Sequence, residues 1–416
     1  MISSLNNKIK KKQLKIAIIG LGYVGLPIAD AFSKHFKVVG YDINKSRISD
    51  LNNNIDSNDI RKKIKKKFSK NLIFTYKKNL LKNCDVFIIT VPTPVNKRNI
   101  PNLKSLDSAI NDLICFDLKG KFIVIESTVF PTLCSKYIKL IQLKKKILLD
   151  KDFYFGFSPE RINPSDNFYT IKNIDKIVSS SSSKSVNFLK KLYSKIVNKI
   201  HLSNSIEDAE MAKIIENTQR DINIAFINEI SIICNKLNLN FKNVLKLAST
   251  KWNFLKFKPG LVGGHCISVD PYYLTHILKK ANYKPKVILS GRQINENYHK
   301  NIVSFFEKKL KSKKIKILIS GLTYKEDCND VRNSKAFNLS TLLKKKYLQV
   351  DLYDPNLKKN KVYNQIILDK PKKNFYDLII ICVRHRIFFK KSKLLLKKFG
   401  KKNCKYYDIK LGGFLN

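Results

Sequence analysis

Short apolar runs, each followed by a segment with helical character, recur along the first third of the chain. Residues 15–19 (KIAII) form the first run and end at a glycine-rich turn, and residues 26–36 then predict a helix that begins near Pro27. The intervening segments are long enough for crossover helices, which is typical of a parallel, doubly wound sheet. A run of five serines at residues 179–183 predicts a loop. The later strand-like runs lie at residues 37–41, 85–90 and 121–125.

The periodicity changes in the middle of the chain. From Ser205 to about Leu247 apolar residues recur at spacings of three and four, which predicts long helices. A second strand followed by glycine begins near Lys314, and further strands are predicted at 349–353 and 377–383. We therefore predict an α/β protein with two Rossmann-like, doubly wound parallel-sheet domains joined by a central region of long helices. The expected domain ranges are 1–204 for the first Rossmann domain, 205–312 for the helical region and 313–416 for the second α/β domain.

The composition predicts a folded protein of more than one domain. Hydrophobic residues make up 44% of the 416 residues and charged residues 27%, which is enough apolar material for sizeable cores. The formal charge is +49, from 81 Lys and Arg against 32 Asp and Glu. Lysine pairs and triplets are spread over the whole chain and no nucleic-acid motif accompanies them, so we interpret the charge as a solvated lysine surface without a specific nucleic-acid partner.

The eight cysteines lie far apart in the sequence, without a C-x-x-C pair and without the spacing of Cys/His metal ligands. This pattern disfavours a disulfide framework and a zinc site, and we predict no bound metal. No stretch reaches the ~18 uninterrupted apolar residues that a membrane-spanning helix requires. We therefore expect a cytoplasmic protein without a membrane partner.

The most specific motif is Gly20-Leu-Gly22-Tyr-Val-Gly25, directly after the first predicted strand, with Asp42 closing the next strand. Gly20 permits a tight turn, Gly22 lets the backbone approach a pyrophosphate, and Gly25 lets helix and strand pack closely. The following helix N-terminus offers oriented N–H groups to phosphates. A carboxylate at position 42 accepts hydrogen bonds from both ribose hydroxyls and repels a 2′-phosphate. The motif therefore predicts a site for NAD rather than NADP.

A second motif places a cysteine beside two glycines. In Gly263-Gly264-His265-Cys266 the glycines expose backbone N–H groups, and Asp270 follows four residues after the cysteine. A thiolate attacks far faster than a thiol, and a nearby Lys or His⁺ lowers the pKa that controls the thiolate population. The segment is a plausible nucleophile loop, with a buried, inert cysteine as the commoner alternative.

Three further groups of polar residues are weak signals on their own. One group falls on a single face of a predicted helix, where solvated salt-bridge partners are the alternative interpretation. Its members are Lys213, Glu216, Asn217 and Arg220. The other two groups are the turn Ser158-Pro159-Glu160-Arg161, and Lys325 with Asp330 and Arg332 beyond the first strand of the second domain.

These pieces, taken in order, resemble the UDP-glucose/GDP-mannose dehydrogenase family, four-electron oxidoreductases that convert the C6 alcohol of a nucleotide sugar to a carboxylate. The resemblance covers almost the whole chain. Within the family, the motifs are similar to the branch that oxidises UDP-N-acetylhexosamines for bacterial surface polysaccharides. The segments that carry the resemblance are SPERINP (158–164), NTQRD (217–221), TKWNF (250–254), PGLVGGHC (259–266) and GLTYKEDCNDVRNS (321–334).

The resemblance implies catalytic roles for the polar motif residues. Cys266 is implied to capture the C6 aldehyde as a thiohemiacetal, which a second NAD oxidises to a thioester. Glu160 is implied to activate the water that cleaves this thioester. The other implied roles are the ordering of the water used in the first oxidation, by Asp270 and Thr128, and the stabilisation of oxyanions, by Lys213 and Asn217.

The resemblance also implies binding residues and a homodimer formed through the central helices. The implied substrate is UDP-N-acetylglucosamine or UDP-N-acetylgalactosamine. UDP-glucose relatives lend an arginine from a neighbouring subunit just before the cysteine loop, but the nearest cation here is Lys251, so that contact is not carried over. The implied NAD contacts are Gly20, Gly22, Tyr23, Val24, Gly25, Asp42, Arg47, Thr90, Pro92, Thr93, Ser127 and Thr128. The implied substrate contacts are Arg161, Arg220, Gly263, Gly264, Lys325 and Arg332.

Three alternative functions stay open at this point. The first is a UDP-glucose 6-dehydrogenase. The second is a two-electron β-hydroxyacid dehydrogenase, which shares a Rossmann domain followed by helices but needs neither Cys266 nor a second α/β domain. The third is a polyanion-binding protein on a Rossmann scaffold, which predicts steeply salt-dependent nucleic-acid binding and leaves Glu160, Lys213 and Asp270 unexplained.

Overall fold

The computed structural model describes residues 1–56, 67–161, 170–310, 312–357, 360–390 and 393–415. These residues form two compact units. The first unit comprises Met1–Glu216 and Tyr272–Ala281, and the second comprises Asn217–Pro271 and Asn282–Asn416. The division falls inside two helices, α7 (Ile206–Lys236) and α9 (Asp270–Leu278).

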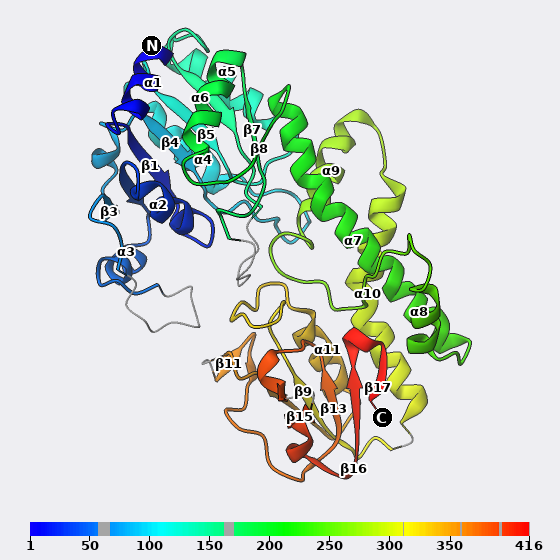
Figure 1. The fold of residues 1–416 in the computed structure, drawn as a ribbon. Helices are drawn as coiled ribbons and strands as arrows, with labels where there is room; N and C mark the ends of the chain where they lie inside the picture. The colour runs from blue at the N-terminus through cyan, green and yellow to red at the C-terminus, as the bar shows by residue number, and fades with distance from the viewer. Residues whose placement is uncertain (57–66, 162–169, 311, 358–359, 391–392, 416) are drawn as a thin grey trace. The chain divides into compact units, whose positions relative to one another are not determined.

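One large sheet forms the framework of the first unit (Figure 1). Its described strands run in the order β3-β2-β1-β4-β5-β6-β7-β8. Neighbours from β3 to β6 are parallel, β7 is antiparallel to β6, and β8 is parallel to β7. The strands are β1 (Lys15–Ile19), β2 (Lys37–Tyr41), β3 (Leu72–Thr75), β4 (Val86–Ile89), β5 (Phe122–Ile125), β6 (Tyr154–Phe157), β7 (Lys176–Ser180) and β8 (Ile200–Leu202).

The helices of this unit pack on the sheet because its central strands are apolar on both faces. Every residue of β4 and β5 is buried, and only Lys15 of β1 is exposed, which is expected of parallel strands covered on both sides. In one core, Ile18 of β1 packs with Leu26 of α2 and Phe188 of α6. The helices are α1 (Ile2–Lys10), α2 (Gly25–Ser33), α3 (Lys45–Asn52), η1 (Lys78–Leu81), α4 (Lys104–Ile114), α5 (Leu133–Lys145), α6 (Ser183–Tyr193), the start of α7, most of α9 and η2 (Lys279–Ala281).

Two local expectations for this unit are wrong in detail. The helix predicted at 26–36 is α2, which begins at Gly25 and ends at Ser33, after which the N–H of Phe36 still bonds the carbonyl of Phe32. The serine run is not simply a loop, because its first two residues lie in β7. Their buried hydroxyls donate to carbonyls of β6, from Ser179 to Phe157 over 2.8 Å and from Ser180 to Phe155 over 2.6 Å.

A second, smaller sheet forms the framework of the second unit. Its described strands run in the order β10-β9-β13-β16-β17, parallel throughout except for the last pair. Two short hairpins, β11 (Lys361–Val362) with β12 (Gln365–Ile366) and β14 (Phe389–Lys390) with β15 (Lys393–Leu394), lie outside it. The sheet strands are β9 (Lys316–Ser320), β10 (Gln349–Tyr353), β13 (Tyr376–Ile381), β16 (Gly400–Asp408) and β17 (Gly413–Leu415). The predicted fold class is confirmed.

The helical region predicted from Ser205 is α7 followed by α8 (Phe241–Ala248). The chain breaks between them where Asn238 adopts a φ of 54°, and the side chain of Asn240 then caps α8 by accepting a hydrogen bond from Asn243 N. The remaining helices of the second unit are α10 (Lys286–Lys309), α11 (Lys335–Lys344), η3 (Arg386–Phe388), η4 (Leu395–Phe399) and η5 (Ile409–Leu411).

A buried polar network joins α7 to α10 within the second unit. The carboxylate of Asp221 accepts hydrogen bonds from Arg292 and Asn295, each over 2.7 Å, and Asn295 also accepts one from Asn228 over 2.8 Å. All four side chains are buried. Because buried polar groups are costly when unpaired, this network fixes the register of the two helices.

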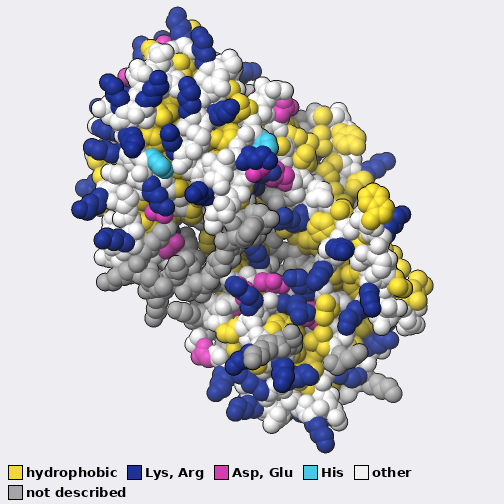
Figure 2. Space-filling model, viewed as in Figure 1, with side chains coloured by type: hydrophobic (Ala, Val, Ile, Leu, Met, Phe, Trp, Pro, Cys, Tyr) yellow, Lys and Arg dark blue, Asp and Glu magenta, His cyan; other side chains and the backbone are white. Residues whose placement is uncertain are grey.

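The positive charge is spread over the surface rather than gathered on one element. Figure 2 shows Lys and Arg side chains scattered over the visible faces of both units, with acidic side chains between them. Among the described residues, no helix is long and apolar enough to cross a membrane. The cytoplasmic location stays a prediction.

Candidate active site

The glycine-rich turn follows β1 in the first unit. Gly20 has a φ of 96°, and its N–H donates to the carbonyl of Tyr41 over 2.8 Å. A Cβ at Gly25 would lie 1.8 Å from the carbonyl oxygen of Gly20, so only glycine fits there. At Gly22, by contrast, a Cβ would meet no atom within 4 Å, so this side of the turn is open.

Asp42 directly follows β2, the strand next to this turn. Its Oδ2 accepts a hydrogen bond from Leu21 N over 2.8 Å, and its Oδ1 accepts one from Asn44 N over 2.9 Å. Arg47 lies beneath the turn with its side chain buried. Its Nε donates to the carbonyl of Leu21 over 3.0 Å, and its Nη1 lies 2.8 Å from Asp56. In this arrangement Arg47 braces the turn, and its contact with a dinucleotide stays a prediction.

The hydroxyl side chains after β4 and β5 hold these loops together. Thr90 donates to the carbonyl of Gly20 over 2.7 Å, Ser127 donates to that of Val91 over 2.7 Å, and Thr93 donates to that of Thr128 over 2.8 Å. Tyr273 of α9, which the sequence analysis missed, donates its hydroxyl to the carbonyl of Thr93.

Pro92 is exposed in the loop after β4, while Tyr23, Val24 and Thr128 are half-buried. Together the residues of this edge fit a dinucleotide. A turn open at Gly22, a helix that begins at Gly25 and a carboxylate at the end of β2 provide the surface that a pyrophosphate and a ribose require.

Glu160 follows β6 and is almost buried. Its Oε1 accepts a hydrogen bond from Arg161 N over 2.7 Å, and its Oε2 lies 3.5 Å from Nζ of Lys176. Lys176 also forms an ion pair with Glu126, which in turn accepts a hydrogen bond from the hydroxyl of Tyr193 over 2.5 Å. The sequence analysis missed this buried group of Glu126, Lys176 and Tyr193.

Arg161 points to the start of α7. Its guanidinium makes two hydrogen bonds to Glu216, from Nη2 over 2.6 Å and from Nε over 3.2 Å, and Nη1 donates to the carbonyl of Asp175 over 2.9 Å. This fork geometry is that of a bidentate ion pair. The guanidinium of Arg161 is therefore already paired with a carboxylate, and its contact with the substrate stays a prediction.

Lys213 lies on α7 in the first unit and is buried. One turn before it, the buried carboxylate of Glu210 accepts hydrogen bonds from the N–H groups of Thr132 and Cys134 over 2.6 and 2.9 Å. These N–H groups belong to the first turn of α5 and the residue before it, so Glu210 caps that helix. Burial raises the pKa of Glu210 to about 7. This cap fixes the stretch of α7 that carries Lys213.

The cysteine loop lies in the second unit, and Cys266 is exposed in it. Gly264 has a φ of 85°, and a Cβ there would lie 2.6 Å from the ring of Tyr324. Its N–H donates to the carbonyl of Arg332 over 3.0 Å, and its carbonyl accepts a hydrogen bond from Asn333 over 2.8 Å. The loop is therefore clamped to the segment after β9. The alternative of a buried, inert cysteine does not fit this geometry.

The histidine before the cysteine is not a source of positive charge at neutral pH. Burial, together with the nearby guanidinium of Arg332, lowers the pKa of His265 below its ordinary value. The sequence analysis allowed for a His⁺ beside Cys266, and the lowered pKa of His265 disfavours that role for this residue.

Asp270 begins α9 and is buried. Its N–H donates to the carbonyl of Cys266 over 2.8 Å, and its Oδ2 accepts a hydrogen bond from Nδ2 of Asn217 over 2.5 Å. Asn217, Asp270 and the cysteine loop are thus connected within the second unit. The residues predicted to share one face of this helix are divided between the two units, because Lys213 belongs to the first unit and Asn217 to the second.

The basic residues predicted to bind substrate differ in their surroundings. Arg332 is exposed and forms a hydrogen-bonded ion pair with Asp330, with Nη2 2.5 Å from Oδ2 and Nε 3.0 Å from Oδ1. Arg220 is exposed on α7, and Lys325 is half-buried. The motif residues 162–164 lie outside the described residues.

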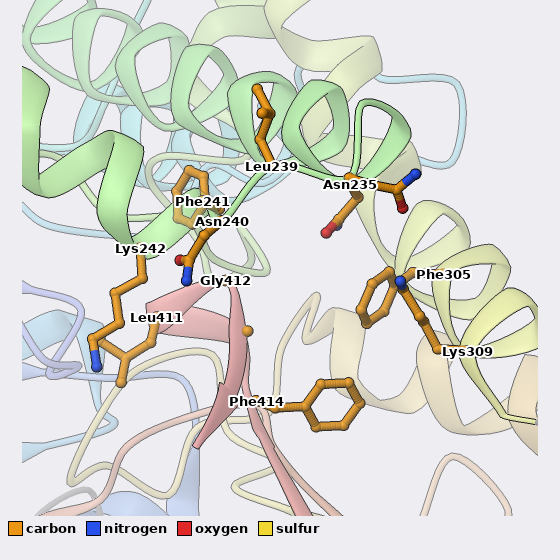
Figure 3. A pocket seen from close by; sticks show the side chains of 12 residues that line it. Asn235, Leu239, Asn240, Phe241, Lys242, Phe305, Lys309, Leu411, Gly412 and Phe414 are labelled. Atoms are coloured by element: carbon orange, nitrogen blue, oxygen red, sulfur yellow. The ribbon is translucent and has the colours of Figure 1, made fainter. Parts of the chain in front are cut away.

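Other sites for chemistry are few in the described part of the chain. No group of three or more His, Cys, Asp or Glu there could hold a metal ion, and none of the eight cysteines, all of them described, forms a disulfide. A cavity of about 360 Å³ lies in the second unit between the start of α8, the end of α10 and β17 (Figure 3). Its lining, which includes Asn240, Phe305 and Phe414, contains none of the predicted site residues.

Family models match the chain in three consecutive parts. The NAD binding domain of the UDP-glucose/GDP-mannose dehydrogenase family matches residues 14–197, the central domain matches 207–297 and the UDP binding domain matches 318–410. The chain belongs to this family. It is therefore an NAD-dependent nucleotide-sugar 6-dehydrogenase, and its substrate is a UDP-sugar. The second α/β domain, which a two-electron β-hydroxyacid dehydrogenase does not need, is accounted for as the UDP binding domain.

Individual relatives cover nearly the full chain. A UDP-N-acetyl-D-glucosamine 6-dehydrogenase of Pseudomonas aeruginosa is 40% identical over 409 residues, 96% of this chain and 97% of that protein. A UDP-N-acetyl-D-mannosamine dehydrogenase of Methanococcus vannielii is 33% identical over 402 residues, 92% of this chain and 90% of that protein. The structure of a UDP-D-ManNAc dehydrogenase from Pyrococcus horikoshii superposes with a TM-score of 0.82 at 30% identity, over 96% of this chain and 100% of that chain.

Proposed function

We propose that this enzyme oxidises the C6 alcohol of a UDP-N-acetylhexosamine to the carboxylate for the synthesis of a surface polysaccharide. The observation that carries the proposal is the exposed thiol of Cys266 on a loop that hydrogen bonds of Gly264 hold to the segment after β9. The named relatives reported above act on N-acetylated UDP-sugars, which favours an N-acetylhexosamine over UDP-glucose. UDP-N-acetylglucosamine is the first choice because the 40% identical relative acts on it, and UDP-N-acetylgalactosamine is the second.

The proposed reaction has four balanced steps. The alcohol loses a hydride and a proton to give the aldehyde. The Cys266 thiol adds to the aldehyde carbon, with the thiol proton transferred to the oxygen, to give a thiohemiacetal. Loss of a second hydride and a proton gives a thioester. Water then attacks the thioester carbon, the C–S bond breaks, and the thiol and the carboxylic acid, which ionises, are released.

The protein residues are proposed to act at different steps. Glu160 takes the proton of the attacking water, and Asp270 with Thr128 orders the water used in the first oxidation. Lys213 and Asn217 stabilise the oxyanions, as a cation and an amide donor can. NAD, when bound, accepts a hydride in each of the two oxidations. The residues proposed to hold it are those of the turn from Gly20 to Gly25, Asp42 and the loops after β4 and β5.

Covalent capture explains how two oxidations proceed without release of an aldehyde. The thiohemiacetal keeps the sugar attached while one reduced cofactor leaves and an oxidised one enters. Arg161, Arg220, Lys325 and Arg332, with the backbone of Gly263 and Gly264, are proposed to bind the UDP-sugar.

We also propose that two copies of the chain associate through the central helices. Within the second unit, Phe226 and Ile233 of α7, Leu247 of α8, and the large side chains after it, Trp252 and Leu255, are exposed; Trp252 is 91% exposed. Figure 2 shows hydrophobic side chains gathered where α8 lies in Figure 1. Contiguous exposed apolar residues of this kind mark an interface, and a second copy is the proposed occupant. The domain ranges 1–204, 205–312 and 313–416 stay predictions, and the proposed interface lies in the second of them.

The test counts NADH formed per sugar consumed with four substrates in parallel: the UDP derivatives of N-acetylglucosamine, N-acetylgalactosamine, N-acetylmannosamine and glucose. Two NADH per N-acetylated sugar are expected. Replacement of the thiol in Cys266→Ser should abolish turnover, by at least about 10³-fold, because the thioester can no longer form.

The matched control is Cys115→Ser, which removes another exposed thiol, at the end of α4. This variant should keep the wild-type rate. One NADH per sugar, or full activity of Cys266→Ser, would refute the covalent route, whereas preferred use of UDP-glucose would refute the substrate class alone.

A further inference from the structure

A buried ionic group lies at the carboxyl edge of the first unit's sheet. Glu126 directly follows β5, Glu160 comes three residues after the end of β6, and Lys176 is the first residue of β7. Because β7 is antiparallel to β6, it begins at the edge where β6 ends. A parallel β7 would place Lys176 at the opposite edge. The carboxyl edge is also where open α/β sheets bind their ligands.

The ammonium of Lys176 is surrounded by this group. Its Nζ forms an ion pair with Glu126, lies 3.5 Å from Oε2 of Glu160 and donates to the carbonyl of Pro159 over 3.3 Å. The ring of Tyr193 lies under the ammonium, 5.4 Å from Nζ to the ring centroid. Lys176 is 5% exposed and Glu126 is 2% exposed. Such a burial of an ammonium is tolerated because two carboxylates and an aromatic face surround it.

The two carboxylates differ in their access to solvent and in their partners. Among the described residues, the carboxylate of Glu126 forms an ion pair with Lys176 and accepts a hydrogen bond from the hydroxyl of Tyr193. Burial raises the pKa of Glu126 to about 7, against the lowering effect of Lys176. Glu160 receives Lys176 on one oxygen and the N–H of Arg161 on the other. Lys176 thus connects a structural carboxylate to the one proposed to act on water.

We propose that Lys176 is a positioning residue for thioester hydrolysis, which holds the Glu160 carboxylate in the orientation from which it takes the proton of the attacking water. Glu126 and Tyr193 fix the ammonium of Lys176 in turn. This inference rests on the proposed function, since it concerns the last step of that reaction. In this step the water oxygen bonds to the thioester carbon, the water proton passes to Glu160, and the C–S bond breaks with the electron pair going to Cys266.

The role predicts a defect confined to one step. Without Lys176, both oxidations still occur on the first substrate molecule, and the thioester then persists. The variant for the test is Lys176→Met combined with Glu126→Gln, because removal of the lysine alone would leave an uncompensated buried carboxylate. Comparison with Glu126→Gln alone isolates the loss of the ammonium.

The measurement is rapid mixing with UDP-N-acetylglucosamine and excess NAD, followed by acid quench and intact-protein mass spectrometry. In the double variant we expect a burst of two NADH per active site, a steady-state rate lower by about 10² -fold, and an acyl adduct on most of the enzyme. Lys176→Arg keeps the positive charge and should restore hydrolysis to within about tenfold of the wild type. A purely structural role would lower the burst and the steady state together, without an adduct.

Glu160→Gln separates the failure of this inference from the failure of the proposed function. If Glu160→Gln accumulates the adduct and the folded double variant hydrolyses at the rate of Glu126→Gln, the role of Lys176 is refuted and that of Glu160 stands. If Glu160→Gln also hydrolyses normally, the proposed role of Glu160 is refuted as well. Loss of the burst in a folded double variant would likewise overturn the inference, because it would place Lys176 before hydrolysis.

Discussion

Two glycine turns in this molecule share one backbone design. Gly20 follows β1 and Gly321 follows β9, with φ values of 96° and 81°. Each donates its N–H to the last residue of the adjoining strand, Gly20 to Tyr41 over 2.8 Å and Gly321 to Tyr353 over 3.0 Å. The next residue in each turn donates its N–H to an aspartate that follows that strand.

The aspartates differ in what else surrounds them. Asp42 is half-buried, and its two oxygens accept hydrogen bonds from the backbone N–H groups of Leu21 and Asn44. Asp354 is 2% exposed, and Nε2 of the fully buried His385 lies 3.0 Å from its Oδ2. A carboxylate sealed by an imidazole cannot receive a ribose. The same strand–turn–strand unit is therefore proposed to serve a cofactor in the first unit, whereas it serves internal structure in the second.

The segments that follow the two turns also differ, because only the first leads directly into a helix. After Gly20 the chain enters α2 within five residues, and Gly25 at its start packs on the turn itself. After Gly321 there is no second glycine before α11, which begins only at Lys335. The helix start beside the turn, which the second turn lacks, is therefore the feature that we propose binds the phosphates.

Alanine substitutions at the two turns should have the largest and most contrasting effects. In Gly25→Ala the new Cβ would fall 1.8 Å from Gly20 O, so the turn must open. We expect KM for NAD to rise by about 100-fold or more, roughly 3 kcal/mol. In Gly321→Ala the Cβ would fall 2.4 Å from Val383 O at a positive φ, and we expect the free energy of unfolding to fall by about 2–4 kcal/mol.

Steady-state kinetics at varied NAD and urea unfolding measure the two effects side by side. The folded fraction of Gly321→Ala should keep its KM for NAD. If that KM rises as much as in Gly25→Ala, the two turns do not have separate functions and the comparison fails.

The backbone of the glycine turn after β1 was predictable from the sequence because its requirements are local. Three glycines at fixed spacing after an apolar run specify it without any distant partner. The fold class followed from the same strand and helix alternation, and the central helices from their apolar spacing. Helix ends were less predictable, since α2 ends at Ser33 although the apolar spacing, and the hydrogen bond from Phe36 N–H to the carbonyl of Phe32, continue beyond it.

The buried group around Lys176 was not predictable for the opposite reason. Its members come from the residue after β5, from β7 and from α6, and each looks ordinary in its own segment. Lys176 stands before a serine run in a chain that is rich in lysine, so its charge gave no signal. Only the antiparallel direction of β7, which the predicted parallel sheet did not contain, brings it to Glu126 and Glu160. Sequence reasoning succeeds here for the family and the fold class, and it fails for contacts between strands.

Asparagine at the two aspartates sharpens the comparison with a smaller effect. In Asp42→Asn one acceptor oxygen becomes a donor, so KM for NAD should rise by about 10-fold while the free energy of unfolding changes by less than about 1 kcal/mol. In Asp354→Asn the buried partner of His385 is weakened, and the free energy of unfolding should fall by about 1–3 kcal/mol with no change in KM for NAD. The same two measurements decide, and an exchange of the two outcomes would reverse the assignment of the carboxylates.

The smallest expected effect is that of an alanine at Gly22, on the open side of the first turn. A Cβ there meets no atom of the chain within 4 Å, and the φ of this residue is not positive, so Gly22→Ala should leave the free energy of unfolding unchanged. Any change in KM for NAD in this variant must therefore come from contact of the new methyl group with the bound cofactor. We expect KM for NAD to rise by about threefold to tenfold, because a methyl group would hold the pyrophosphate away from the backbone N–H groups. Gly413→Ala, at an equally open position of β17, is the matched control and should change neither quantity. If Gly22→Ala also changes neither, the open side of the turn is not where the pyrophosphate approaches, and the difference between the two turns rests on Asp42 and Gly25 alone.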